Sequence, residues 1–148
     1  MVLGLAALAV FVAAPLHAIY RNSHPFNEGR NFYRSSAMEL TRQWHKLSDD
    51  PLPLISGDDA LAFAVAFYSL DHPEYKRAWD PPDTPLPATL KKGWAAICFS
   101  DDKGCMAFIN RTTPLFRFVR SEFSVQSSLI GVPGAKRQVT ALLVRPED

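Results

Sequence analysis

The sequence has little of what several large classes of protein need. Its 148 residues include only two cysteines, and basic and acidic residues nearly balance at a formal net charge of +1. Two cysteines are too few for a disulfide scaffold or for a zinc site made of cysteines alone. The dispersed basic residues and the near-neutral charge give no sign of nucleic-acid binding. Length and composition instead favour one domain with an apolar core.

Familiar catalytic motifs are also missing. The sequence has no Gly-x-Ser-x-Gly elbow, and its four histidines do not show the spacing of metal ligands. The glycines in 131–134 form neither a Walker nor a Rossmann pattern, so a hairpin loop is the favoured interpretation. We therefore predict no catalytic residue, no metal site and no cofactor within this chain.

Charge is absent from the first part of the chain. Residues 2–20 carry no formal charge, and the first basic residue is Arg21. An apolar run of about 19 residues just spans a hydrocarbon core. We predict a transmembrane helix over residues 1–20, with a signal peptide and a buried core helix as alternatives. Residues 21–34 are then a juxtamembrane linker, and residues 35–148 a soluble α/β domain.

A strand, a pair of aspartates and a helix follow one another twice. The apolar strand predicted at 52–55 leads to a helix at 60–68 that is apolar on nearly every side. The strand predicted at 94–99 leads to a helix through 105–109. Such repetition is typical of βα units in a parallel sheet. We predict a small layered α/β domain with a mostly parallel central sheet flanked by helices.

Two further segments complete the predicted layers. Ser36 and Glu39 have the spacing of a capping box, which predicts a helix over 36–47. Residues 116–125 and 138–144 are rich in β-forming residues. We expect them to be a terminal pair of strands joined by a loop of about ten residues, with an antiparallel pairing as one arrangement.

The aspartate pairs have two interpretations. Asp58 with Asp59, and Asp101 with Asp102, have the composition of carboxylate pairs for acid–base chemistry or metal binding. Helix capping is favoured, because an aspartate before a helix accepts hydrogen bonds from free N–H groups and suits the positive end of the dipole. Ligands of α/β sheets bind at the carboxyl ends of the strands. We therefore expect any small ligand at this edge of the sheet.

The richest polar cluster comes at the end of the first apolar helix, where Tyr68, Asp71 and His72 lie close in sequence. A histidine oriented by an aspartate can act as a general base. Adjacent residues rarely orient each other in this way, and Pro73 takes the residue before it out of the helix. A helix end is the favoured interpretation, with a docking contact and a catalytic base as alternatives.

Cys98 and Cys105 flank the second strand-to-helix turn. In an oxidising compartment they would form a disulfide that closes a short loop. Free buried thiols are the alternative. The choice depends on whether the domain lies outside the cytoplasm.

Three motifs follow one another along the chain: Trp44-His45, Gly57-Asp58 and the run Ala66-Phe-Tyr-Ser-Leu-Asp-His-Pro73. In this order they resemble the carboxyl-terminal region of bacterial family 39-type glycosyltransferases. These enzymes are relatives of dolichyl-phosphate-mannose–protein mannosyltransferases and aminoarabinose transferases. The resemblance covers residues 36–105, and its most specific part is the run that contains Tyr68, Asp71 and His72.

The resemblance implies that residues 2–20 are the last span of a multi-span enzyme in the inner membrane and that the domain faces the periplasm. Such an enzyme moves a sugar from a polyprenyl-phosphate donor to a lipid or protein acceptor, with a divalent metal as a candidate cofactor. This chain would lack the catalytic loop and would not be catalytic by itself. It would serve as an accessory part that recognises the acceptor or covers the active site.

The expected partners are therefore membrane lipid, the polyprenyl-phosphate sugar and the acceptor, but not nucleic acid. Asp58, Tyr68, Asp71 and His72 are the expected contact residues. The alternative function is a membrane-tethered periplasmic module that binds a small ligand and has no catalytic activity.

Overall fold

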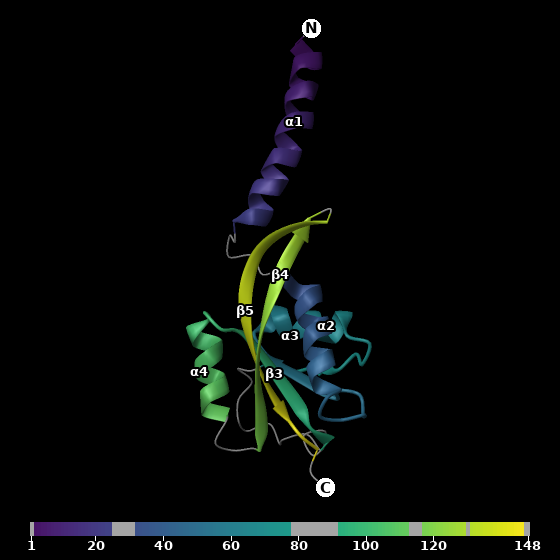
Figure 1. Ribbon diagram of the computed structural model, residues 1–148, viewed down its shortest axis with the longest axis vertical. Coiled ribbons are helices and arrows are strands. Elements are labelled where there is room, and N and C mark those ends of the chain that lie inside the picture. The colour runs from purple at the N-terminus through teal and green to yellow at the C-terminus, as the bar shows by residue number, and fades with distance from the viewer. Residues whose placement is uncertain (1, 25–31, 78–91, 113–116, 130, 147–148) are drawn as a thin grey trace.

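The computed structural model describes residues 2–24, 32–77, 92–112, 117–129 and 131–146. These residues form a layered α/β domain from which one helix projects (Figure 1). The elements in chain order are α1 (Val2–Ser23), α2 (Tyr33–Trp44), β1 (Leu54–Gly57), α3 (Asp59–Tyr68), β2 (Glu74–Tyr75), β3 (Trp94–Phe99), α4 (Lys103–Thr112), β4 (Phe118–Leu129) and β5 (Val132–Val144).

The five strands form one mixed sheet in the order β2-β1-β3-β5-β4. β1 lies parallel to β2 and β3, whereas β5 lies antiparallel to β3 and β4. The predicted mostly parallel sheet is therefore wrong. The antiparallel pairing expected as one arrangement of the terminal strands is confirmed, but β5 is also antiparallel to β3, and this makes the sheet mixed. Residues of β4 and β5 occupy most of the predicted loop of about ten residues, and Gly131, with a φ of 78°, lies between the two strands.

Helices cover both faces of the sheet. α2 and α3 lie on one face, and α4 lies on the other (Figure 1). Trp44 of α2 and Leu61 of α3 are fully buried in the first layer, and Ile109 of α4 is fully buried in the second. All positions of β1 and β3 are buried. Because both faces of these strands are covered, β3 is apolar throughout instead of alternating, and Ser56 is the one polar residue of β1.

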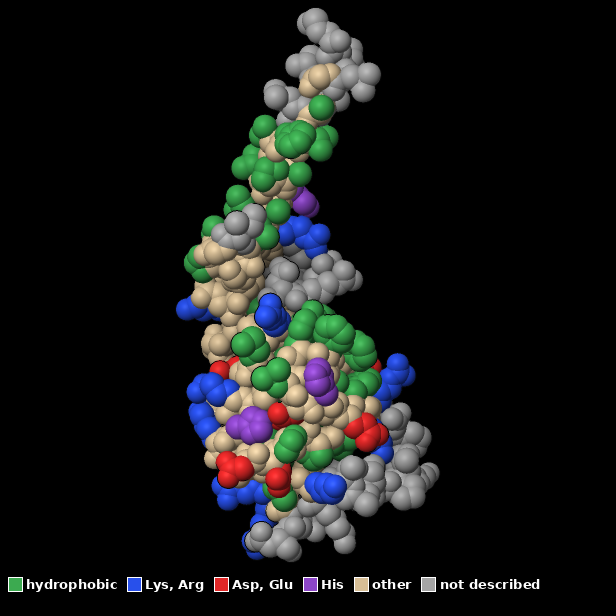
Figure 2. Space-filling view, turned by 90° about the vertical axis from the view of Figure 1, so that its right-hand side faces the viewer, with side chains coloured by type: hydrophobic (Ala, Val, Ile, Leu, Met, Phe, Trp, Pro, Cys, Tyr) green, Lys and Arg blue, Asp and Glu red, His purple; other side chains and the backbone are tan. Residues whose placement is uncertain are grey.

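α1 projects away from the sheet, and Figure 2 shows hydrophobic side chains along it. None of the helices among the described residues combines the length and apolar character that crossing a membrane requires. The transmembrane helix predicted over residues 1–20 is therefore wrong. Only residues 2–16 precede the first polar side chain, His17. A helix of that length rises about 22 Å, which is short of the roughly 30 Å hydrocarbon core.

The last turn of α1 is fixed to the β4–β5 hairpin. The buried Asn22 donates from Nδ2 to the Val132 carbonyl at 3.2 Å, and its own carbonyl accepts from Ser127 Oγ at 3.1 Å. Gly134 provides the space for this contact, since a Cβ there would collide with the Asn22 carbonyl. The end of α1 is thus part of the folded domain.

α2 begins before the predicted cap. Ser36 lies inside the helix, and its buried Oγ has no hydrogen-bond partner among the described residues, so the predicted capping box is wrong. Phe32 stands at the N-cap instead and packs edge-on against Phe99, with ring centres 6.3 Å apart. Of the predicted linker 21–34, both ends are helical. Its residues 25–31 lie outside the described residues.

Candidate functional site

A hollow of about 330 Å³ opens where β1 and β3 end. This is the carboxyl edge of the parallel strands, where the sequence predicts that a small ligand would bind. The residues that line it come from α2, both strand-to-helix junctions and β5: Tyr33, Asp58, Ala60, Phe99, Asp101, Asp102 and Arg137. We call it the carboxyl-edge hollow.

Asp58 forms the β1 side of this hollow, and Gly57 directly precedes it. Gly57 has a φ of 118°, and a Cβ there would collide with the backbone carbonyl of Ile97 on β3. The Asp58 N–H donates to the same carbonyl at 2.8 Å. The Asp58 side chain accepts from the Leu61 N–H at 2.8 Å, so it caps α3. The capping interpretation of Asp58 is confirmed, and the same residue lines the hollow.

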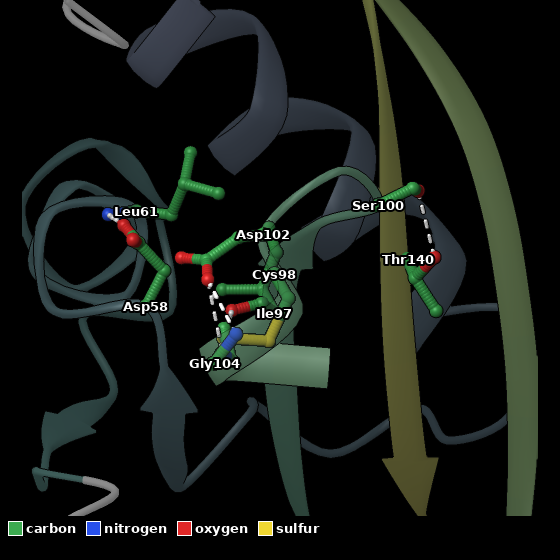
Figure 3. The surroundings of a disulfide bond; sticks show 9 residues. Asp58, Leu61, Ile97, Cys98, Ser100, Asp102, Gly104 and Thr140 are labelled. Atoms are coloured by element: carbon green, nitrogen blue, oxygen red, sulfur yellow. Dashed lines mark hydrogen bonds between the residues drawn. A yellow bond between two sulfur atoms is a disulfide. The ribbon is translucent and has the colours of Figure 1, made fainter. Parts of the chain in front are cut away.

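The β3 side is held by a second cap and by a disulfide (Figure 3). Asp102 Oδ1 accepts from the Gly104 N–H at 2.9 Å and from the Cys105 N–H at 3.1 Å. Cys98, near the end of β3, is joined to Cys105 in the first turn of α4, with Cα atoms 5.7 Å apart. This separation is usual for a disulfide. The two cysteines therefore tie a strand to the helix that follows it.

Arg137 reaches the hollow from β5. Its Nη2 donates to both carboxylate oxygens of Asp101, at 2.7 and 3.0 Å. Its guanidinium carbon lies 3.7 Å from the centre of the Phe99 ring, which gives a cation–π contact. Only 20% of the Arg137 side chain is exposed. The cation is thus held in place, and among the described residues its other N–H groups have no partner.

The four predicted contact residues do not come together. Asp58 lies at the carboxyl edge. Asp71 and His72 line a second hollow of about 550 Å³, at the amino ends of β1 and β3, with Lys92 and several prolines. Tyr68 lies exposed at the end of α3, where its ring packs edge-on against that of Phe67. Of the four expected contact residues, only Asp58 therefore lies in the carboxyl-edge hollow.

Asp71 orients His45 and not His72. Asp71 Oδ1 lies 3.0 Å from His45 Nε2, and Oδ2 accepts from the Leu52 N–H at 2.8 Å. The hydrogen bond to Asp71 raises the pKa of His45, with burial acting in the opposite direction. His72 has a φ of 45°, and its Nδ1 lies 3.3 Å from the Ala66 carbonyl. Two motifs that are distant in sequence therefore meet in one pair, His45 and Asp71.

Sequence reasoning missed three residues of the carboxyl-edge hollow: Tyr33, Phe99 and Arg137. Arg137 is 36 residues from Asp101 in sequence. The antiparallel pairing of Phe99 with Val139 brings the two side chains together. The available signal was an arginine just before the apolar half of the last strand. It could be used only after the pairing of β3 with β5 was known.

The described residues contain no group of three or more His, Cys, Asp or Glu side chains placed to hold a metal ion. In the carboxyl-edge hollow, Asp58 and Asp102 accept from helix N–H groups, and Asp101 binds Arg137. These carboxylates therefore already have partners within the chain. Comparisons of the chain with protein-family models, with curated proteins and with solved structures give no match.

Proposed function

We propose that the chain is a non-catalytic accessory domain of a family 39-type glycosyltransferase and that its carboxyl-edge hollow binds the hydroxyl-rich part of the sugar donor or of the acceptor. The observation that carries this proposal is the chemistry of the hollow. Carboxylates, an arginine and aromatic side chains line one depression at the carboxyl ends of β1 and β3.

A sugar suits such a lining. Its hydroxyl groups donate to carboxylate oxygens and accept from guanidinium N–H groups. Asp101 and Arg137 offer these two kinds of partner side by side, 2.7 Å apart. Tyr33 adds an aromatic side chain to the lining. A few placed polar groups beside apolar surface are the usual means by which a small-molecule site orients its ligand.

One of the motifs that carry the family resemblance lies at this hollow, because Asp58 of Gly57-Asp58 lines it on the β1 side. The other two motifs meet away from it. His45 and Asp71 form a hydrogen-bonded pair between the end of α2 and the turn that follows α3, and Asp71 lines the hollow at the amino ends of the strands. In this proposal these motifs build the accessory domain, and the transfer reaction takes place in a separate catalytic part of the enzyme. A divalent metal, where such an enzyme uses one, would be held in that part.

The disulfide supports a periplasmic location for the domain. Disulfides form and persist in oxidising compartments, of which the bacterial periplasm is one. Cys98 and Cys105 are joined and buried. A domain that meets a polyprenyl-phosphate sugar on the periplasmic side would fold under such conditions.

Calorimetric titration of the full chain with mannose, aminoarabinose and their phosphates tests the hollow. Asp101→Asn should weaken binding about tenfold, because one charged hydrogen bond contributes roughly 1.4 kcal/mol or more. Asp50→Asn is the matched control, since Asp50 is an exposed carboxylate of the hollow at the amino ends of the strands. Binding by no sugar, or an equal loss in both variants, would contradict the proposal.

A transfer assay separates an accessory domain from a free-standing binding module, which could use the same hollow. Membranes that lack the chain should transfer sugar from a polyprenyl-phosphate donor more slowly. Added wild-type chain should restore the rate, and added Asp101→Asn chain should not. Sugar binding without any effect on transfer would favour the free-standing module.

A further inference from the structure

The turn between β3 and α4 carries two of the carboxylates that line the carboxyl-edge hollow. Asp101 and Asp102 lie between Phe99, the last residue of β3, and Lys103, the first residue of α4. Asp101 holds Arg137, and Asp102 caps α4. The positions of both carboxylates thus depend on how the start of α4 is placed against the end of β3.

The disulfide fixes that placement. Cys105 is tied to Cys98 on β3 by its side chain, and its own N–H donates to Asp102 Oδ1 at 3.1 Å. Figure 3 shows the disulfide directly beside this cap. One residue therefore links the strand, the helix and the capping carboxylate. Both sulfur-bearing residues are buried, at 0% and 3% exposed, so the bond is shielded from thiols in solution.

α4 has less other support than α3. α3 packs beside α2 in one layer, whereas α4 is the one helix of the described residues on its face of the sheet (Figure 1). α4 has only 10 residues, and a helix of about that length is marginal by itself in water. Without the disulfide, the side-chain hydrogen bonds of the Asp102 cap would still hold the first turn, and Ile109 would still pack against the sheet further along α4.

We propose that the Cys98–Cys105 disulfide positions Asp101 and Asp102, so that the carboxyl-edge hollow is formed only in the oxidised chain. The ligand that would then bind there is the sugar of the proposed function, on which this part of the inference rests. Opening the bond requires a two-electron reductant, for which we use a dithiol. The reductant supplies two electrons and two protons, becomes a cyclic disulfide and leaves Cys98 and Cys105 as thiols.

The first test compares the full chain in its oxidised form, after reduction with dithiothreitol, and as the Cys98→Ser/Cys105→Ser variant. Hydrogen exchange at the amides of residues 104 and 105 should be at least tenfold faster in the reduced chain and in the variant than in the oxidised chain. The Leu61 amide, which donates to the cap of α3, is the internal control and should not change. Unchanged exchange at residues 104 and 105 would overturn the inference.

The second readout follows Arg137 by NMR. Its side-chain signals should be displaced by the Phe99 ring in the oxidised chain and return towards free values without the disulfide. Because the cysteine variant can fail to fold, Asp102→Ala is examined in the oxidised chain as well. The displaced Arg137 signals should remain there, since the disulfide still holds the turn. Their loss would show that the cap, and not the disulfide, positions Asp101.

Sugar binding distinguishes this inference from the proposed function. If the oxidised chain binds no sugar while exchange and the Arg137 signals change as expected, the proposed function fails and the positioning role stands. If oxidised and reduced chains bind sugar equally well, the disulfide does not position the site, and the inference is overturned.

Discussion

At the junction between β1 and α3 the first aspartate of a pair caps the helix, whereas between β3 and α4 the second one does. Asp58 accepts from the Leu61 N–H, and Asp102 accepts from the N–H groups of residues 104 and 105. The first junction is shorter, because Asp58 directly follows the last residue of β1. The length of the turn, and not the sequence of the pair, decides which carboxylate becomes the cap.

The aspartate that does not cap binds a neighbouring element in each case. Asp59 accepts from the Tyr75 hydroxyl at 2.7 Å, and Asp101 binds Arg137 at 2.7 Å. Burial, followed by the hydrogen bond to Asp59, raises the pKa of Tyr75. Only the Asp101 contact lies in the hollow. The two junctions thus share a motif, but only the second offers a carboxylate next to a fixed cation.

The junctions also differ in how the backbone is held. The first relies on Gly57, which lets β1 approach β3 closely, and the second relies on the Cys98–Cys105 disulfide. Substitutions at these two places should therefore affect stability for different physical reasons.

The largest effect is expected for Gly57→Ala. The new Cβ would collide with the Ile97 carbonyl, and a φ of 118° is strained for alanine. We expect the free energy of unfolding to fall by more than about 2 kcal/mol. Gly104→Ala is the control, because its nearest atom lies at 3.4 Å and alanine favours a helix. Urea titration measures the free energy of unfolding of both variants. Equal losses of stability would refute the role of the close approach of β1 to β3.

The next effect in size is expected for the Cys98→Ser/Cys105→Ser variant. The bond closes a loop with a sequence separation of 7. Loss of this constraint on the unfolded chain should cost about 2 to 3 kcal/mol. Thermal unfolding under oxidising conditions measures the change. Wild-type protein in dithiothreitol should lose the same amount of stability. If reductant does not change the thermal unfolding of the wild type, the prediction is contradicted.

Smaller effects should identify the caps. Asp58→Ala and Asp102→Ala should each cost about 1 kcal/mol, because each leaves helix N–H groups without an acceptor. The matched substitutions Asp59→Ala and Asp101→Ala should cost less than about 0.5 kcal/mol, since these carboxylates are exposed and partly screened. A larger loss in the second pair, measured by urea titration, would reverse our assignment of caps.

The smallest effect is expected for the His45–Asp71 pair, which lies outside both junctions. Because the folded state raises the pKa of His45, the stabilisation should be complete below the unfolded pKa of about 6.5 and vanish as pH rises through the folded pKa. The His45 side chain is 40% exposed, so solvent screening limits the stabilisation by this pair to about a few tenths of a kcal/mol. His45→Gln should therefore be destabilised relative to wild type at about pH 5.5 but not at about pH 9.

Much of the layered fold follows from local sequence. The predicted strand at 94–99 is β3, and the predicted helix at 60–68 is α3 with one residue added. Continuous apolar runs identified both elements. β3 is buried throughout, whereas α3 buries residues such as Leu61 and Val65 and leaves Phe63 and Phe67 exposed. The mixed sheet did not follow, because local sequence does not show which earlier strand β5 pairs with, and β5 pairs antiparallel with β3. The length and polarity of α1 were also misjudged, since the final turns contain His17 and Asn22.

The candidate site was predicted only in part. Its location and the capping role of Asp58 follow from general rules for helix starts and sheet edges. Arg137 and Phe99 could not be found in this way, because their contact depends on the pairing of β3 with β5. The pairing of Asp71 with His45 could not be found either, since the two residues lie 26 positions apart in sequence.

The burial of β5 changes along its length, and this has a kinetic consequence. Residues 139–144 are buried between β3 and β4, whereas the first half of the strand is mostly exposed and pairs with β4 alone. Amides of 139–144 should therefore exchange with solvent only when the whole domain unfolds, and those nearer the hairpin turn through local opening. Arg137 lies at the boundary between these two parts of β5. We therefore expect the two parts to belong to different cooperative units of unfolding, which meet at the carboxyl-edge hollow.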